Sequence, residues 1–245
     1  GTCDPAYVEV REEFERNFEE REEVGASVCV TVEGKTVVDL WGGQSNNRTG
    51  TQWTDKTVSV VFSSTKGATA ICAHMLAARG QLDLDAPVAQ YWPEFAQSGK
   101  ETIPVRMLLN HQAGLPAVRK TLPAGAYADW DRMVKAMEEE EPFWEPGTAN
   151  GYHAITYGWL VGEVVRRVSG KSLGTFFKEE ITDPLHLDFW IGLPEEKEGL
   201  VAPMIPAKPD PARPLFQELV KPGTIQALTM GNNGGYMGPP PMFDS

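Results

Sequence analysis

Ser63 is the serine of this chain that has a lysine three positions later, in the run Ser63-Ser64-Thr65-Lys66. Residues three apart on a helix face the same way, so the Lys66 amine can reach the Ser63 hydroxyl. A free serine hydroxyl is a poor nucleophile, and a desolvated lysine can accept its proton. The spacing therefore predicts acyl-transfer chemistry at Ser63. A serine that only caps the helix, beside a solvated lysine, would give the same pattern and stays open at this point.

Tyr152 is a second candidate, placed in Gly151-Tyr152-His153 directly before a predicted helix. A phenol held next to Ser63 and Lys66 could shuttle a proton, because the lysine charge favours the phenolate. The alternative is a partly buried tyrosine whose hydroxyl is already hydrogen-bonded. For His153 we favour a structural interpretation, in which a histidine at a helix N-terminus bonds locally.

Metal and nucleotide motifs are missing from the sequence. The four histidines are dispersed without HExxH spacing, and the three cysteines form no CxxC pair. The run Gly170-Lys171-Ser172 resembles the end of a P-loop, but Val165 stands where the first glycine must be. No serine lies in a GxSxG elbow. We therefore predict no metal and no cofactor, and the cysteine spacing favours a reducing, cytoplasmic compartment.

The composition is that of an ordinary globular protein, with 41% hydrophobic and 23% charged residues in 245. A net charge of -12 would repel nucleic acid and anionic membrane surfaces. No apolar run approaches the roughly 20 residues that a spanning helix needs. The sequence thus predicts neither nucleic-acid nor membrane partners.

The elements that must position these side chains follow from hydrophobic periodicity. We expect an amphipathic helix over 5–23, then a hairpin of strands 26–32 and 36–40 around Gly34. A helix over 64–79 would bury one face, made of Ala68, Ile71, Cys72, Met75 and Leu76. A later helix over 154–168 contains Gly158 and Gly162, which would permit close approach of a neighbour, and Ser172 would cap the next helix.

The strand count is low for a stable sheet. A lone hairpin is marginal in water unless other strands extend it. The last 52 residues hold ten of the 19 prolines and offer no clear strand. We divide the chain into 1–62 with the first helix and hairpin, 63–185 as a helical lobe carrying both motifs, and 186–245 as a Pro/Gly-rich return segment.

Together the motifs resemble the serine β-lactamase-related family, which includes class C β-lactamases, D-alanyl-D-alanine peptidases and family VIII carboxylesterases. The similarity is carried by residues 61–67, 110–115, 146–147, 151–154 and 157–163, and is strongest to the esterase branch. It implies an α+β, β-lactamase/transpeptidase-like fold, with an antiparallel sheet flanked by helices and a helical lobe. It also implies Ser63 as the acylated nucleophile, Lys66 as its proton acceptor and Tyr152 as partner base.

Two departures from the family pattern qualify the resemblance. Class C β-lactamases carry an asparagine two places after the tyrosine, where this chain has Ala154. The family's Lys/His-x-Gly motif, on an inner strand that supplies the second oxyanion N–H, has no match. We therefore expect only the N-terminal part of the sheet here, completed by a C-terminal part or a second polypeptide.

The expected function is that of a serine carboxylesterase cleaving small esters through an acyl-enzyme. The alternatives are a β-lactamase or D-Ala-D-Ala peptidase-like acyl transferase, and a non-catalytic scaffold or binding module with the same fold.

Overall fold

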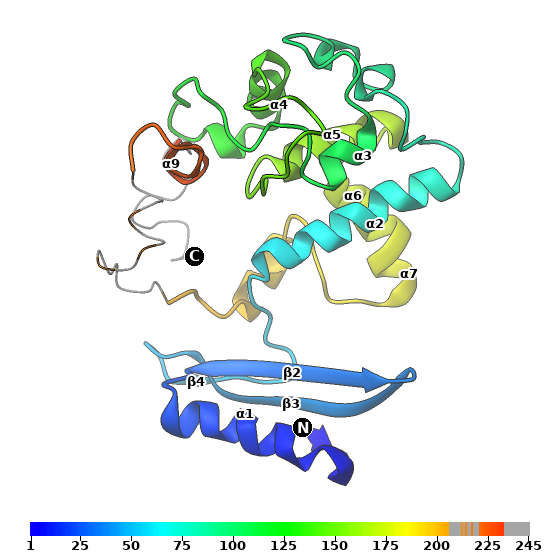
Figure 1. Cartoon of the computed structure of the whole chain (residues 1–245). Coiled ribbons are helices and arrows are strands. Elements are labelled where there is room, and N and C mark those ends of the chain that lie inside the picture. Colours follow the sequence, from blue (N-terminus) through cyan, green and yellow to red (C-terminus); the bar gives the residue numbers. More distant parts are fainter. Residues whose placement is uncertain (206–211, 213, 215–216, 218–220, 233–245) are drawn as a thin grey trace. The chain divides into compact units, whose positions relative to one another are not determined.

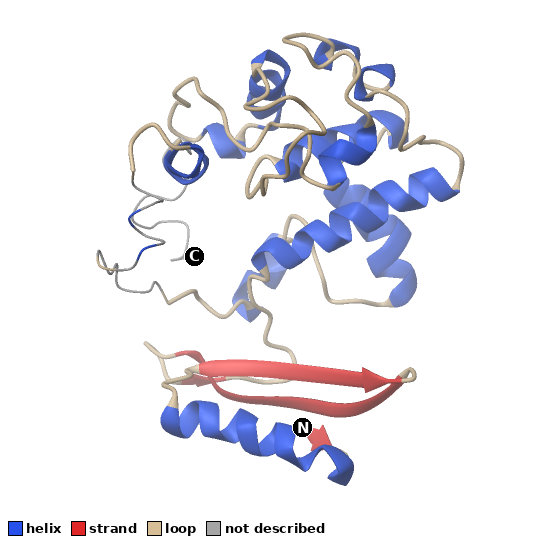
Figure 2. Ribbon diagram, viewed as in Figure 1, coloured by secondary structure: helices blue, strands red, loops and turns tan. Residues whose placement is uncertain are grey.

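The computed structural model describes residues 1–205, 212, 214, 217 and 221–232. Its contacts divide the described chain into two compact units. The first comprises residues 1–60 and 193–205, and the second comprises 61–192 with the described residues from 212 onward. The strands lie in the first unit and most helices in the second (Figure 2). The α+β class predicted from the sequence is confirmed, whereas the three-segment division stays a prediction.

A small antiparallel sheet forms the first unit. Its strands are β1 (Thr2–Cys3), β2 (Gly25–Val32), β3 (Lys35–Asn46) and β4 (Thr51–Gln52). The order is β1-β3-β2, with β4 also paired to β3. The unit also holds the short 3₁₀ turns η1 (Pro5–Tyr7) and η7 (Glu195–Leu200), and an isolated bridge joins Val58 to Val201.

The predicted hairpin turn is present, with φ of +50° at Glu33 and +77° at Gly34. Positive φ at both central residues gives the twist that tight hairpins favour. The second strand runs to Asn46, six residues beyond its predicted end. Trp41–Gly43 continue to pair with Gly25–Ser27, and Gln44 and Asn46 pair with β4. Gly43 is required there, since a Cβ would lie 2.2 Å from the Val24 carbonyl oxygen.

Helix α1 (Val8–Glu20) supplies the apolar cover of this sheet, as its periodicity predicts (Figure 1). Val10 and Phe14 pack on the buried Val38 and Leu40 of β3. On the side away from β3, β2 pairs with no other described residue, so this edge of the sheet is unpaired in the described part of the chain.

The second unit is helical and carries the larger core (Figure 1). Its α-helices are α2 (Thr65–Ala78), α3 (Val105–Leu109), α4 (Trp130–Glu139), α5 (Tyr157–Ser169), α6 (Leu173–Phe177), α7 (Asp183–Leu185) and α9 (Ile225–Gly231). Short 3₁₀ turns are η2 (Phe62–Ser64), η3 (Val88–Gln90), η4 (Pro93–Phe95) and η5 (Ala126–Ala128), and a π-turn, η6 (Lys178–Thr182), joins α6 to α7. None of the described helices is long and apolar enough to cross a membrane.

Helix α2 is buried along a face slightly different from the predicted one. Ala68, Cys72 and Leu76 are buried as expected, but Ile71 is 52% exposed. Thr69 and Ala73 take its place in the core. Both α5 and α6 pack against α2, and residues at i, i+1, i+4 and i+5 form the stripe that faces them.

Helix α5 begins at Tyr157 rather than at Ala154. The preceding residues are held outside the helix by long-range bonds, including Thr156 Oγ1 to the Leu115 carbonyl oxygen at 2.7 Å. Gly162 allows close approach as predicted, because a Cβ there would lie 2.8 Å from the Trp130 ring. Gly158 does not, since a Cβ at that position would meet no atom within 4 Å. Ser172 caps α6 by accepting the Thr175 N–H, which confirms that prediction.

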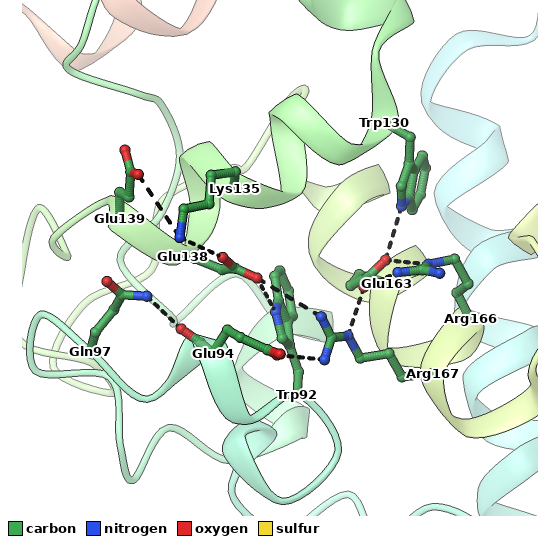
Figure 3. A network of polar contacts seen from close by, with 10 residues as sticks. All are labelled: Trp92, Glu94, Gln97, Trp130, Lys135, Glu138, Glu139, Glu163, Arg166 and Arg167. Carbon is green, nitrogen blue, oxygen red and sulfur yellow. Dashed lines mark hydrogen bonds and ion pairs between the residues drawn. The ribbon is translucent and has the colours of Figure 1, made fainter.

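A buried carboxylate network ties α5 to α4 and η4 (Figure 3). Glu163 is fully buried and accepts from Trp130 Nε1 at 2.9 Å. Arg166 and Arg167 also donate to it, at 2.6–2.7 Å. Burial raises the pKa of Glu163, but these donors outweigh it and hold the pKa below its ordinary value. The network fixes the helix whose first turn borders the site described next.

Candidate active site

Ser63 lies in the 3₁₀ turn that leads into α2, and its side chain is exposed. The residue before it, Phe62, has a φ of +43°, a region that bulky side chains rarely adopt. This bend brings the chain sharply into the helix. The Ser63 hydroxyl therefore stands at the N-terminal end of a 14-residue helix, where the positive end of the helix dipole favours developing negative charge.

The structure brings Lys66 to Ser63. The Lys66 amine donates to Ser63 Oγ at 3.0 Å and to the main-chain carbonyl oxygen of Ala154 at 2.7 Å. The second bond joins the Ser-x-x-Lys segment to the Tyr-His segment, 88 positions later. Sequence spacing indicated the first contact, but nothing in the sequence indicated the second.

Tyr152 completes the cluster. Its ring centre lies 4.8 Å from the Lys66 amine, and its side chain is largely open to solvent, with the residue 54% exposed. Burial raises the pKa of Tyr152. The Ser63 and Lys66 side chains, through hydrogen bonds, and the Lys66 charge lower it, with a net pKa below its ordinary value. The lowered pKa thus favours the phenolate, the form in which a tyrosine can accept a proton.

The His153 side chain is fully buried and its ring forms hydrogen bonds to two main-chain groups. Its Nδ1 lies 2.6 Å from the Gly151 carbonyl oxygen, and its Nε2 accepts the Leu115 N–H at 2.9 Å. These partners require a neutral ring with the proton on Nδ1. Burial lowers the pKa of His153 to about 4, against the opposing effect of the Gly151 bond. The local bond agrees with the structural interpretation, and the bond to Leu115 extends it.

His111 holds the same segment from the other side. Its carbonyl oxygen accepts the Gly151 N–H at 3.1 Å, and its Nδ1 accepts the His153 N–H at 3.2 Å. Its ring lies edge-on to that of Tyr152, with centroids 5.0 Å apart. Burial and the Lys66 charge lower the pKa of His111. Hydrogen bonds thus hold the segment 151–153 at Gly151 and at His153, the residues on either side of Tyr152.

The Trp144 ring packs against Gly151 and His153 of this segment. A Cβ on Gly151 would lie 2.4 Å from the Trp144 ring, so only glycine fits at that position. The Trp144 ring also stands edge-on to His153, at 5.9 Å. From the sequence we assign no role to Trp144, and none to His111 beyond its place in the segment 110–115 that carries part of the resemblance. Their signal, a histidine and a tryptophan in Gly/Pro-rich loops, has no periodicity to identify it.

A cavity of about 290 Å³ opens beside Ser63 and Lys66. Its wall also includes aromatic and apolar side chains from α5 and η5. The lining residues are Phe62, Ser63, Thr65, Lys66, Thr69, Tyr127, Ala154, Ile155, Tyr157, Gly158 and Trp159. Among the described residues of that lining, Lys66 is the one charged side chain. Nowhere in the described chain do three His, Cys, Asp or Glu side chains gather in a way that could hold a metal.

Comparison with known proteins gives consistent matches. A family model described as Beta-lactamase matches residues 12–239. The chain is 39% identical over 191 residues to Esterase/beta-lactamase LipL of Mycobacterium tuberculosis (strain ATCC 25618 / H37Rv), covering 77% of this chain and 43% of LipL.

Solved structures agree in fold. A crystal structure of a family VIII carboxylesterase matches with a TM-score of 0.80 and 43% identity, covering 84% of this chain and 57% of that one. A penicillin-binding protein homolog from Caulobacter crescentus matches with a TM-score of 0.81 and 41% identity, covering 85% and 56% respectively. The chain therefore spans about half the length of the relatives that it matches.

Proposed function

The chain belongs to the beta-lactamase family, as its motifs predict, and we propose that it is a serine carboxylesterase that cleaves small esters through an acyl-enzyme on Ser63. The observation that carries this proposal is the contact of the Lys66 amine with Ser63 Oγ at 3.0 Å, beside a tyrosine whose pKa is lowered. A scaffold without turnover has no need of these three side chains in contact.

In the first half-reaction Ser63 Oγ attacks the ester carbonyl carbon, and its proton passes to the Lys66–Tyr152 pair. The tetrahedral oxyanion then collapses, the bond to the alkoxy oxygen breaks, and the pair returns the proton to the leaving alcohol. In the second half-reaction the pair takes a proton from water. The hydroxide attacks the acyl-enzyme and releases the carboxylic acid, with the proton restored to Ser63.

Esters are favoured over β-lactams by the residue at position 154. Class C β-lactamases have an asparagine there by the family pattern, whereas Ala154 offers no side-chain amide to a lactam substrate. The name of one similar protein, a family VIII carboxylesterase, supports the same choice, whereas that of another, an esterase/beta-lactamase, includes both activities. A β-lactamase or peptidase acting through Ser63 remains the second candidate, since the same three side chains would serve it.

We also propose that a further polypeptide segment completes the catalyst. The edge of β2 that is unpaired among the described residues would accept a strand of this segment. The segment would also supply the second oxyanion N–H, for which this chain has no motif. The segment is either a C-terminal part of the same protein or a second chain. The free thiols of Cys3, Cys29 and Cys72 support a reducing, cytoplasmic location for the assembly.

The test compares Ser63→Ala with the control Ser64→Ala, which removes the hydroxyl of the neighbouring serine. Hydrolysis of p-nitrophenyl butyrate by the complete assembly should fall by about 10³-fold or more in Ser63→Ala and by far less in Ser64→Ala. A fluorophosphonate should add one adduct to the Ser63 peptide. Unchanged hydrolysis in Ser63→Ala would refute the proposal, and faster turnover of a chromogenic cephalosporin would select the β-lactamase candidate.

A further inference from the structure

The cavity beside Ser63 has walls suited to an apolar group. The rings of Tyr127 and Trp159 pack against each other, tilted by 58° with their centroids 5.0 Å apart, and Phe62 and Ile155 add to the lining. Aromatic side chains contribute large apolar contact surfaces. The cavity therefore offers hydrophobic contact directly next to the proposed nucleophile.

The polar groups of this wall are already bonded to main-chain oxygens. Thr69 Oγ1 donates to the Thr65 carbonyl oxygen at 3.0 Å. The Tyr157 hydroxyl donates to the main-chain carbonyl oxygen of Lys66 at 3.5 Å. The Tyr127 hydroxyl donates to the carbonyl oxygen of Asn232 at 3.3 Å. Burial raises the pKa of Tyr127 to about 12, which keeps this ring neutral. A polar ligand group would find little to bond with here, apart from Ser63, Thr65 and Lys66.

The aromatic wall is anchored rather than loose. Asn232, at the end of α9, donates its side-chain amide to the carbonyl oxygens of Val118 and Lys120 at 2.7 and 2.8 Å, and accepts the Leu122 N–H at 2.8 Å. It therefore fixes the loop before η5 and, through its own carbonyl, the Tyr127 ring. An anchored wall can discriminate between ligands by size, because it cannot move aside to admit a longer one.

Tyr152 indicates which part of an ester this cavity would hold. Its side chain is not among the residues that line the cavity, although it lies next to Lys66. In the proposed mechanism the Lys66–Tyr152 pair protonates the departing alcohol. We assign this step to Tyr152, the member of the pair that lies outside the cavity lining, so the alcohol leaves on the Tyr152 side. The group that stays attached to Ser63 then lies on the other side, in the cavity.

We propose, on the basis of the function proposed above, that this cavity is the acyl-binding site and that Trp159 and Tyr127 restrict it to short, uncharged aliphatic acyl groups. A volume of about 290 Å³ lies just below the roughly 300–1,000 Å³ of typical small-molecule pockets, which suits a short chain. A charged acyl group would lose its hydration among aromatic walls with no partner beyond Lys66.

The first test measures kcat/KM for p-nitrophenyl esters from acetate to decanoate in wild type and Trp159→Ala. Removal of the indole should raise kcat/KM for octanoate relative to butyrate by about tenfold or more, since even one methylene in a pocket can discriminate by that order and the two acyl groups differ by four. Trp190→Ala removes the same side chain at a position outside the lining and should leave the ranking unchanged.

A second variant changes the cavity in the opposite direction. Gly158 lines the cavity within α5, and a Cβ there meets no atom within 4 Å. Gly158→Leu should therefore fold, fill the cavity and lower kcat/KM for butyrate at least about tenfold more than for acetate. Because the two variants must move the preference in opposite directions, misfolding of either one cannot mimic the expected result.

The outcomes separate this inference from the proposed function. If Ser63→Ala abolishes hydrolysis but neither variant changes the acyl ranking, the cavity assignment is wrong and the esterase proposal stands. If the variants change the ranking of alcohols in a series of butyrate esters instead, the cavity holds the leaving group. If hydrolysis does not depend on Ser63, both proposals fail.

Discussion

The Nε2 atom of His153 accepts the main-chain N–H of Leu115 at 2.9 Å, across 38 positions of sequence. Because Nδ1 bonds to the Gly151 carbonyl oxygen, the ring can fill both roles only when it is neutral. The position of Tyr152, one residue away, therefore depends on an imidazole that must stay unprotonated.

This dependence predicts a loss of stability in acid. The folded pKa of His153 is about 4 against an ordinary 6.5, so the unfolded chain binds a proton first. Stability should be intact above pH 6.5 and should fall by roughly 3 kcal/mol as the pH drops to 4. Urea unfolding at pH 7.5, 5.5 and 4.5 measures it.

Two variants of His153 test whether its protonation causes the loss of stability in acid. His153→Gln can donate and accept without titrating, so it should flatten the pH dependence, whereas His153→Ala should be destabilised at every pH. His111→Gln should flatten it further in combination, because the pKa of His111 is also lowered. An unchanged acid slope in the double variant would contradict this account.

Tyr152→Phe tests the phenol while keeping the ring against His111 and Lys66. We expect kcat to fall by about 10²–10⁴-fold, the usual contribution of a positioned general base or acid. In wild type, kcat/KM should rise as the pH rises through the lowered pKa of Tyr152, because the phenolate is the base. The variant should lose that part of the profile. Tyr91→Phe, which removes a hydroxyl bonded to the Asp83 N–H, is the control for activity.

How far the sequence predicts this site depends on the range of each interaction. Ser63 and Lys66 belong to one helix start, so their contact follows from spacing alone. The contact of Lys66 with Ala154 and that of His153 with Leu115 join segments far apart in sequence, and their acceptor or donor is main chain. Main-chain groups are the same at every residue, and so no pattern of residue types can indicate them.

The fold shows the same limit. Hydrophobic periodicity predicts α2 and the core of α5, because burial repeats at helical spacing there. Helix α4 was not predicted, although Asp129 caps it by accepting the Arg132 N–H. Its apolar residues Trp130, Met133, Val134 and Met137 do recur at helical spacing. The stretch lies between Gly/Pro-rich connections, however, and from the sequence we assign it only to a helical lobe. The exposure of Ile71 depends on which neighbours pack on α2, which local periodicity cannot specify.

The carboxylate network of Figure 3 predicts unequal effects from two similar substitutions. Glu163→Gln leaves Arg166 and Arg167 partly unpaired around a buried group and should cost about 3–5 kcal/mol of unfolding free energy. Glu94→Gln removes an exposed partner of Arg167 and should cost less than about 1 kcal/mol. Urea unfolding of both variants measures the difference, and equal costs would show that burial of Glu163 does not matter.

The two glycines of α5 predict opposite changes in stability. Gly162→Ala places a methyl group 2.8 Å from the Trp130 ring and should destabilise by about 1–3 kcal/mol. Gly158→Ala meets no atom and should stabilise by up to about 1 kcal/mol, because alanine favours helix. Thermal unfolding of both variants measures the two shifts. A stabilising Gly162→Ala would mean that α4 and α5 approach each other less closely.

Ala154 serves the site through its carbonyl oxygen and not through its side chain. Every amino acid carries that oxygen, so evolution can exchange the residue at this position without releasing the lysine. A substrate-facing position and a structural anchor are thereby combined in one residue and can still vary independently. Single substitutions at position 154 can therefore change the substrate specificity of such a site while Lys66 stays in contact with Ser63.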